Sequence, residues 1–266
     1  MIGDIAKDLL RGAGDLLDEV TAGRALFRGW LALSLLMILS AAAYGGVLGL
    51  WHGPRLALYV ALKLPLVLLL TSALTVPFSW AGSALLGLPL RVGQVAVLTF
   101  LALAAGSLLL AALAPVALLF TLSAPPPTEE ARTAHNLLYL LHTAFVGGSG
   151  LAGTAVLRRG MRALGRPARV VFFVWIAAFA LVGGEVAWAL RPFVGSVYKP
   201  VVFLRRDALD GNVYEFVFTD ILPHLLGGTP REEKAWKPRS TPKPAPAETQ
   251  MEVQTEVVVS APSTGS

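Results

Sequence analysis

Five long apolar stretches constrain what this chain can fold into more than any other feature of its sequence. An α-helix that crosses a hydrocarbon core of about 30 Å needs about 20 apolar residues. Each stretch is long enough for one crossing, so we expect an all-α fold, a polytopic membrane helix bundle of about five transmembrane helices. The stretches cover residues 29–51, 64–90, 92–128, 133–157 and, interrupted only by Glu185, 170–190.

The composition is that of a small polytopic protein in which much of the apolar surface contacts lipid. The 266 residues are 55% hydrophobic and 15% charged. The absence of cysteine excludes disulfides, thiolate catalysis, iron–sulfur clusters and Cys-ligated zinc. The net charge of +5 does not indicate nucleic-acid binding, because the basic residues lie where membrane topology would put them. A high content of Ala, Leu, Gly and Arg is what a GC-rich bacterial genome would give.

The arginines predict the orientation. The break at 158–169 holds five arginines and no acidic residue, and such loops stay in the cytoplasm. Counting spans outward from it places the N-terminus in the cytoplasm and the C-terminus outside. The net acidic break at 125–132 then lies outside, as expected. We therefore predict a multi-pass protein of the bacterial inner membrane. The first thirty residues lack the pattern of a cleaved signal peptide.

The segments that flank the bundle differ from it in character. Apolar residues recur at helical spacing in positions 1–22, which predicts an amphipathic helix that packs on the membrane domain, docks a partner or senses lipid. Asn212 and Glu215 have the spacing of a capping box and predict a short helix to about Leu226. The expected regions are a cytoplasmic helix (1–25), the bundle (26–191, with spans near 29–51, 56–80, 94–122, 135–157 and 170–190), an external extended segment with a short interfacial helix (192–228) and a disordered tail (229–266).

Lys63 and Glu185 are the only charged side chains inside the expected spans. Charge at membrane depth is costly and usually pairs or lines a pathway. Both residues are expected in the outer half of the bilayer, where an ion pair is feasible. The functional interpretation is a proton or ion relay. The structural interpretation is a pair, or a Lys63 side chain that reaches the outer interface.

His142 is the third intramembrane polar candidate. His135 precedes it by two helical turns, about 10.5 Å along the axis, which is too far for a shared metal ion. We expect a histidine that is satisfied within the bundle or at its interface.

Clusters of glycine predict close helix packing, although such clusters also unwind in some membrane proteins to bind an ion. The expected contact glycines are Gly45, Gly49, Gly148, Gly183 and Gly184. No Gly-Lys-Ser/Thr, Ser-His-Asp or His-Glu-x-x-His arrangement is visible. We therefore expect no catalytic, cofactor-binding or metal-binding residues and no cofactor.

Three apolar segments, at 63–71, 113–120 and 189–196, resemble a group of bacterial multi-span membrane proteins. That group is similar in span count and N-inside orientation to the Yip1-type proteins of membrane trafficking. The resemblance covers roughly residues 26–220. It implies no catalytic residues and favours a scaffold over an enzyme.

The sequence thus favours a non-enzymatic membrane scaffold, or a subunit of a membrane complex, with the lipid bilayer and membrane or periplasmic proteins as partners. The first alternative is a small transporter or channel component that uses Lys63 and Glu185. The second is a lipid-modifying enzyme with its polar residues in the interfacial loops. The sequence leaves open the partner, any transported substrate and the oligomeric state.

Overall fold

The computed structural model describes residues 2–11, 14–23, 26–128, 131–162, 164, 167–194, 201–204 and 211–216. These residues belong to one compact unit, Met1–Phe216. The expected disordered tail at 229–266 lies outside the described residues.

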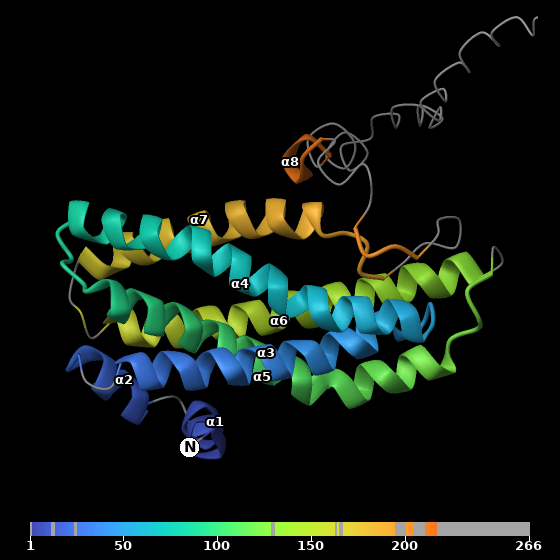
Figure 1. Cartoon of the computed structure of the whole chain (residues 1–266), viewed down its shortest axis with the longest axis horizontal. Coiled ribbons are helices and arrows are strands. Elements are labelled where there is room, and N and C mark those ends of the chain that lie inside the picture. Colours follow the sequence, from blue (N-terminus) through green and yellow to red (C-terminus); the bar gives the residue numbers. More distant parts are fainter. Residues whose placement is uncertain are drawn as a thin grey trace, which may run out of the picture. The chain divides into compact units, whose positions relative to one another are not determined.

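Five helices are long and apolar enough to cross a membrane, and they lie side by side along their length (Figure 1). The helices α4 and α5 have 32 residues each, or about 48 Å, so they extend beyond a core of about 30 Å. The described residues contain no strand, which confirms the predicted all-α bundle. The five helices are α3 (Leu26–Leu50), α4 (Pro54–Leu85), α5 (Val92–Ser123), α6 (Arg132–Arg162) and α7 (Pro167–Ala189).

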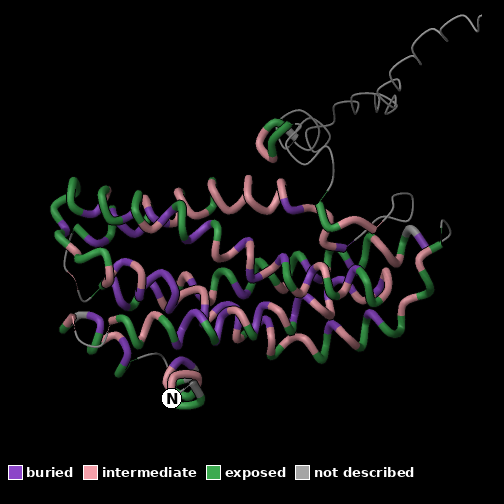
Figure 2. Tube along the Cα trace, in the orientation of Figure 1, coloured by how far each residue is buried: buried purple, intermediate pink, exposed green. Residues whose placement is uncertain are grey.

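The bundle has its core along the central helices. The helix α3 packs against α4 and α5, α5 also packs against α6, and α4 against α7. The α6 and α7 helices have less contact with each other. Large apolar side chains remain exposed, including Leu119 and Leu151, which are 65% and 73% exposed. Exposed residues are distributed along the outer sides of the helices (Figure 2). In water these surfaces would be unfavourable, whereas in a bilayer they face lipid.

Two short helices form the N-terminal region: α1 (Ile2–Arg11) and α2 (Gly14–Thr21). The sequence predicted a single amphipathic helix here, whereas the structure has two. Gly14 opens α2, and glycine is among the weakest helix formers. The carboxylate of Asp8 accepts a hydrogen bond from the Leu16 amide at 3.1 Å, which fixes the second helix against the first.

The apolar face of this helix pair packs on the membrane domain. Leu9, Leu16 and Val20 are buried in the same hydrophobic cluster as residues of α3, α5, α6 and α7. The Gln94 side chain of α5 also donates a hydrogen bond to the Val20 carbonyl at 3.0 Å. Of the three roles considered for this segment, packing on the protein's own bundle is the one observed.

The described part of the C-terminal region is small. A single turn, α8 (Val213–Phe216), begins at Asn212, whose side-chain oxygen accepts a hydrogen bond from the Glu215 amide at 2.7 Å. The predicted helix start is therefore confirmed. The continuation toward Leu226 lies outside the described residues.

Candidate functional site

The ammonium group of Lys63 is fully buried in α4, and it does not pair with Glu185. Its Nζ donates a hydrogen bond to the Pro192 carbonyl at 3.2 Å. The rings of Phe193 and Phe203 lie 5.9 and 5.2 Å from the same nitrogen, within cation–π range. Lys63 thus holds the segment that follows α7 against the bundle. The feasible ion pair is not formed, and Lys63 bonds to a backbone carbonyl instead.

Glu185 lies on α7 beside the start of the C-terminal region. Its Oε1 is buried and has no hydrogen-bond partner among the described residues. The nearby Tyr214 hydroxyl donates instead to the Leu181 carbonyl at 2.6 Å. Burial of this phenol, and next the negative charge of Glu185, raise the pKa of Tyr214 above its ordinary value.

His142 is buried in α6 and takes part in a bond between helices. Its Nδ1 is 2.8 Å from the hydroxyl of Tyr44, a buried residue of α3. His135 lies elsewhere, with its ring centroid 5.4 Å from that of Trp51. The two histidines do not converge. No group of three or more His, Asp or Glu side chains with metal-binding geometry occurs among the described residues.

The glycine predictions are confirmed in part. A Cβ on Gly45 or Gly49 would meet the α4 backbone, at 2.6 Å from Val60 O and 2.7 Å from Leu56 O respectively. Only glycine allows α3 and α4 to approach this closely.

On α7, a Cβ on Gly183 would lie 3.4 Å from the Thr71 side chain of α4, which is an ordinary contact distance. A Cβ on Gly184 would lie 3.1 Å from the Tyr214 hydroxyl, so the glycine makes room for that group. Both glycines therefore lie at contacts between α7 and another element, but the tighter of the two, at Gly184, is with α8 and not with a spanning helix.

The prediction for Gly148 was wrong. This residue is exposed, and a Cβ there would meet nothing within 4 Å. Within this glycine cluster the contact residue is Gly153, whose Cβ would clash with the Ala102 carbonyl of α5, and it pairs with Gly106 of α5. The glycine cluster stays within the continuous helix α6 and does not unwind.

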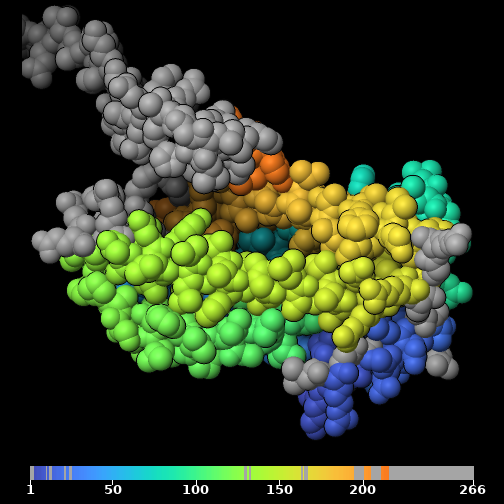
Figure 3. All heavy atoms as spheres, turned by 180° about the vertical axis from the view of Figure 1, so that it is seen from behind, coloured from blue at the N-terminus to red at the C-terminus, as the bar shows by residue number. Residues whose placement is uncertain are grey.

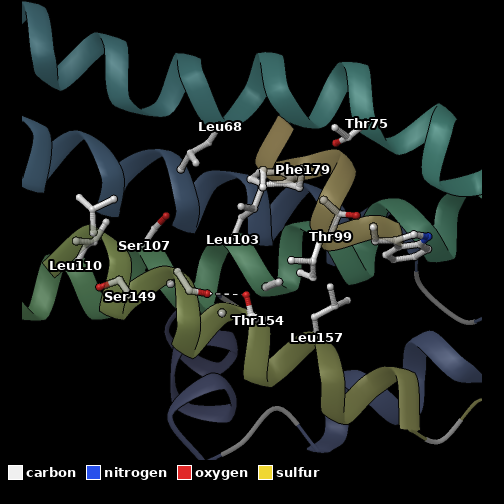
Figure 4. Close-up of a pocket in the computed structure, with 18 of the residues that line it drawn as sticks. Leu68, Thr75, Thr99, Leu103, Ser107, Leu110, Ser149, Thr154, Leu157 and Phe179 are labelled. Carbon is white, nitrogen blue, oxygen red and sulfur yellow. Dashed lines mark hydrogen bonds between the residues drawn. The ribbon is translucent and has the colours of Figure 1, made fainter. Parts of the chain in front are cut away.

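A cavity of about 350 Å³ lies between α4, α5, α6 and α7. Its wall is mainly apolar, with a few hydroxyl groups that include Ser107 and Ser149 (Figure 4). The Oγ of Ser149 is buried and has no hydrogen-bond partner among the described residues. Pockets of this kind bind small apolar ligands. The sequence did not indicate the cavity, since its lining comes from four separate helices.

Trp175 closes one part of the cavity wall. Its indole N–H donates to the Ser79 carbonyl and to the Ser83 hydroxyl, both at 3.0 Å. These bonds fix α7 to α4 and orient the ring. The sequence does not indicate which helix a tryptophan within a long apolar stretch will contact.

These features define the class: a multi-pass α-helical membrane protein whose buried polar groups join its helices. No family model matches the chain, and neither a similar curated protein nor a similar solved structure was found.

Proposed function

We propose that this protein is a non-enzymatic membrane scaffold or a subunit of a membrane complex. The observation that carries the proposal is the use of its intramembrane polar side chains. Lys63, His142 and Trp175 each bond to another segment of the protein, so each is engaged in a structural contact. An intramembrane enzyme would instead direct several such groups toward one reacting centre.

The orientation that we propose places the N-terminal helices in the cytoplasm of a bacterium, at its inner membrane. In support, α2 lies at the same end of the bundle as the arginine-rich junction between α6 and α7, because Gly160 of α6 meets the Leu17 side chain. The positive-inside rule puts such a junction on the cytoplasmic side. The resemblance to Yip1-type proteins favours the same orientation.

The surface proposed for a cytoplasmic partner is the polar face of α1 and α2. Their apolar face is covered by the bundle, whereas Asp15 and Glu19 are exposed. A partner that binds this acidic face would be complementary in charge and therefore basic. The C-terminal segment after α7 is the corresponding surface on the outer side.

Crosslinking in native membranes tests the scaffold proposal. The full-length protein is expected to capture a defined partner that the Asp15→Asn/Glu19→Gln variant loses. The Arg55→Gln variant is the control, because Arg55 is exposed at the opposite end, where it bonds Tyr59. Equal capture by all three proteins would contradict a role for the N-terminal helices.

Transport is the second candidate function, and one observation favours it. A buried carboxylate oxygen with no partner among the described residues, that of Glu185, is what a proton or cation carrier would need. Proteoliposomes with a pH gradient test this candidate. Loss of proton flux in the Glu185→Gln variant would support transport. Unchanged proton flux would leave scaffolding as the better account.

A further inference from the structure

A basic recess lies where α6 ends and α7 begins. Three arginine side chains line it: Arg158 and Arg162 from the last turns of α6, and Arg169 from the first turn of α7. The recess measures about 1150 Å³, and its described lining contains no acidic residue. Its remaining wall is apolar and includes Phe172 and Phe173. A charged end above an apolar wall fits an amphipathic anion better than a soluble one.

The recess and the cavity share no described lining residue, but their linings adjoin along α6 and α7. On α6, Leu157 lines the cavity and the next residue, Arg158, lines the recess. On α7, Phe172 and Phe173 line the recess, and Trp175 lines the cavity one turn later. The two spaces therefore follow the same pair of helices in succession.

The cavity opens toward lipid between α6 and α7. Three of its lining residues, Val146 and Gly150 of α6 and Ala180 of α7, are exposed at its mouth. The space-filling view shows a hollow between these two helices, with atoms of α4 visible behind it (Figure 3). An acyl chain thus has a direct path from the bilayer into the cavity.

The dimensions match one leaflet. Along α6 the cavity extends from Val146 to Leu157, which is about 16 Å at 1.5 Å per residue. Half of a hydrocarbon core of about 30 Å is about 15 Å. A lipid whose phosphate lies at the arginines would therefore have its acyl chain at the depth of the cavity.

We propose that the recess and the cavity together bind one anionic glycerophospholipid from the leaflet at this end of the bundle. Its phosphate accepts hydrogen bonds from Arg158, Arg162 and Arg169, since guanidinium groups suit phosphate oxygens. One acyl chain enters between α6 and α7. Basic pockets between membrane helices bind anionic headgroups in the same way. This proposal does not depend on the scaffold function or on any protein partner.

Titration of lipid onto the delipidated full-length protein in detergent, followed by native mass spectrometry, tests the proposal. The probes are phosphatidylglycerol and phosphatidylcholine with identical acyl chains. We expect one phosphatidylglycerol to bind at least about tenfold more tightly than phosphatidylcholine. Loss of each arginine is expected to weaken binding about fivefold.

Two matched pairs of variants locate the site. Arg162→Gln is expected to weaken phosphatidylglycerol binding, whereas Arg159→Gln is not, because Arg159 is exposed nearby but does not line the recess. Gly150→Leu fills the mouth of the cavity, and Gly147→Leu adds the same side chain outside it. Both glycines have open space at Cβ, so both variants are expected to fold. Only Gly150→Leu should weaken lipid binding.

Three results would overturn the proposal. One is equal affinity for the two lipids. The second is equal loss of binding within either pair of variants, which would indicate a nonspecific charge or surface effect. The third is competition by millimolar inorganic phosphate or glycerol phosphate that displaces the lipid completely, because the acyl chain would then contribute nothing.

Discussion

The Tyr44 hydroxyl and His142 Nδ1, 2.8 Å apart and both buried, join α3 to α6 across the bundle. Both helices also pack against α5, so the bond fixes the rotation of two helices around a third. We expect Tyr44→Phe to lower the free energy of unfolding by about 0.6 kcal/mol, the average for such bonds in membranes, and by no more than about 1.7 kcal/mol.

A double-mutant cycle with His142→Leu isolates this bond. Unfolding by SDS in mixed micelles measures the free energy of each variant. If the two substitutions act independently, with no coupling energy, the Tyr44–His142 bond does not stabilise the bundle.

Close approach of α3 and α4 depends on Gly49. In Gly49→Ala the new Cβ would lie 2.7 Å from the Leu56 carbonyl, so the helices must separate. We expect a loss of about 1–3 kcal/mol in the same SDS unfolding assay. Gly148→Ala is the control, since its Cβ meets nothing and alanine favours a helix by up to about 1 kcal/mol. A Gly148→Ala variant as destabilised as Gly49→Ala would refute the assignment.

Lys63 is expected to hold the segment after α7 rather than the bundle itself. The Lys63→Met variant has an unbranched side chain of similar length. It lacks the ammonium group, and with it the hydrogen bond to Pro192 and the cation–π contacts with two rings. We predict faster amide exchange in residues 201–204, with α3 and α5 unchanged, as measured by hydrogen–deuterium exchange. Faster exchange throughout the bundle would show that Lys63 supports the core instead.

High pH is expected to release α8 from α7. The neutral Tyr214 hydroxyl donates to Leu181, and burial and Glu185 raise the pKa of Tyr214 in the folded state. A raised folded pKa gives stability that is complete below the unfolded pKa of about 10 and is lost as pH rises through the folded value.

Crosslinking between introduced cysteines on α8 and α7 should therefore fall above about pH 10. Tyr214→Phe should show weak crosslinking at every pH. A pH profile that is the same in the wild type and in Tyr214→Phe would show that this hydroxyl does not hold α8.

The five spans could be predicted from the sequence because an apolar run of about 20 residues has few alternatives to a membrane helix. The neighbours against which each helix packs could not be predicted. The spanning helices are apolar on most faces, so periodicity does not separate the lipid-facing side from the inner side. Gly148 and Gly153 illustrate this: both lie in one glycine cluster, yet only Gly153 contacts α5.

The candidate site was predictable to a smaller extent. Lys63, Glu185 and His142 stand out as polar residues within apolar runs, and all three are at least partly buried. Lys63 bonds to a backbone carbonyl and His142 to a tyrosine of another segment, and such contacts depend on how the helices are rotated. The cavity arises from the limited contact between α6 and α7, which is a property of the whole arrangement.

Accessibility of introduced cysteines tests the membrane topology most directly, because the native chain contains no cysteine. Thr128→Cys lies between α5 and α6, and Arg159→Cys lies near the junction between α6 and α7. A membrane-impermeant maleimide applied to intact spheroplasts should label the Thr128→Cys variant. It should label the Arg159→Cys variant only after permeabilisation. Labelling of Arg159→Cys from outside, with Thr128→Cys protected, would contradict the five-span, N-inside account.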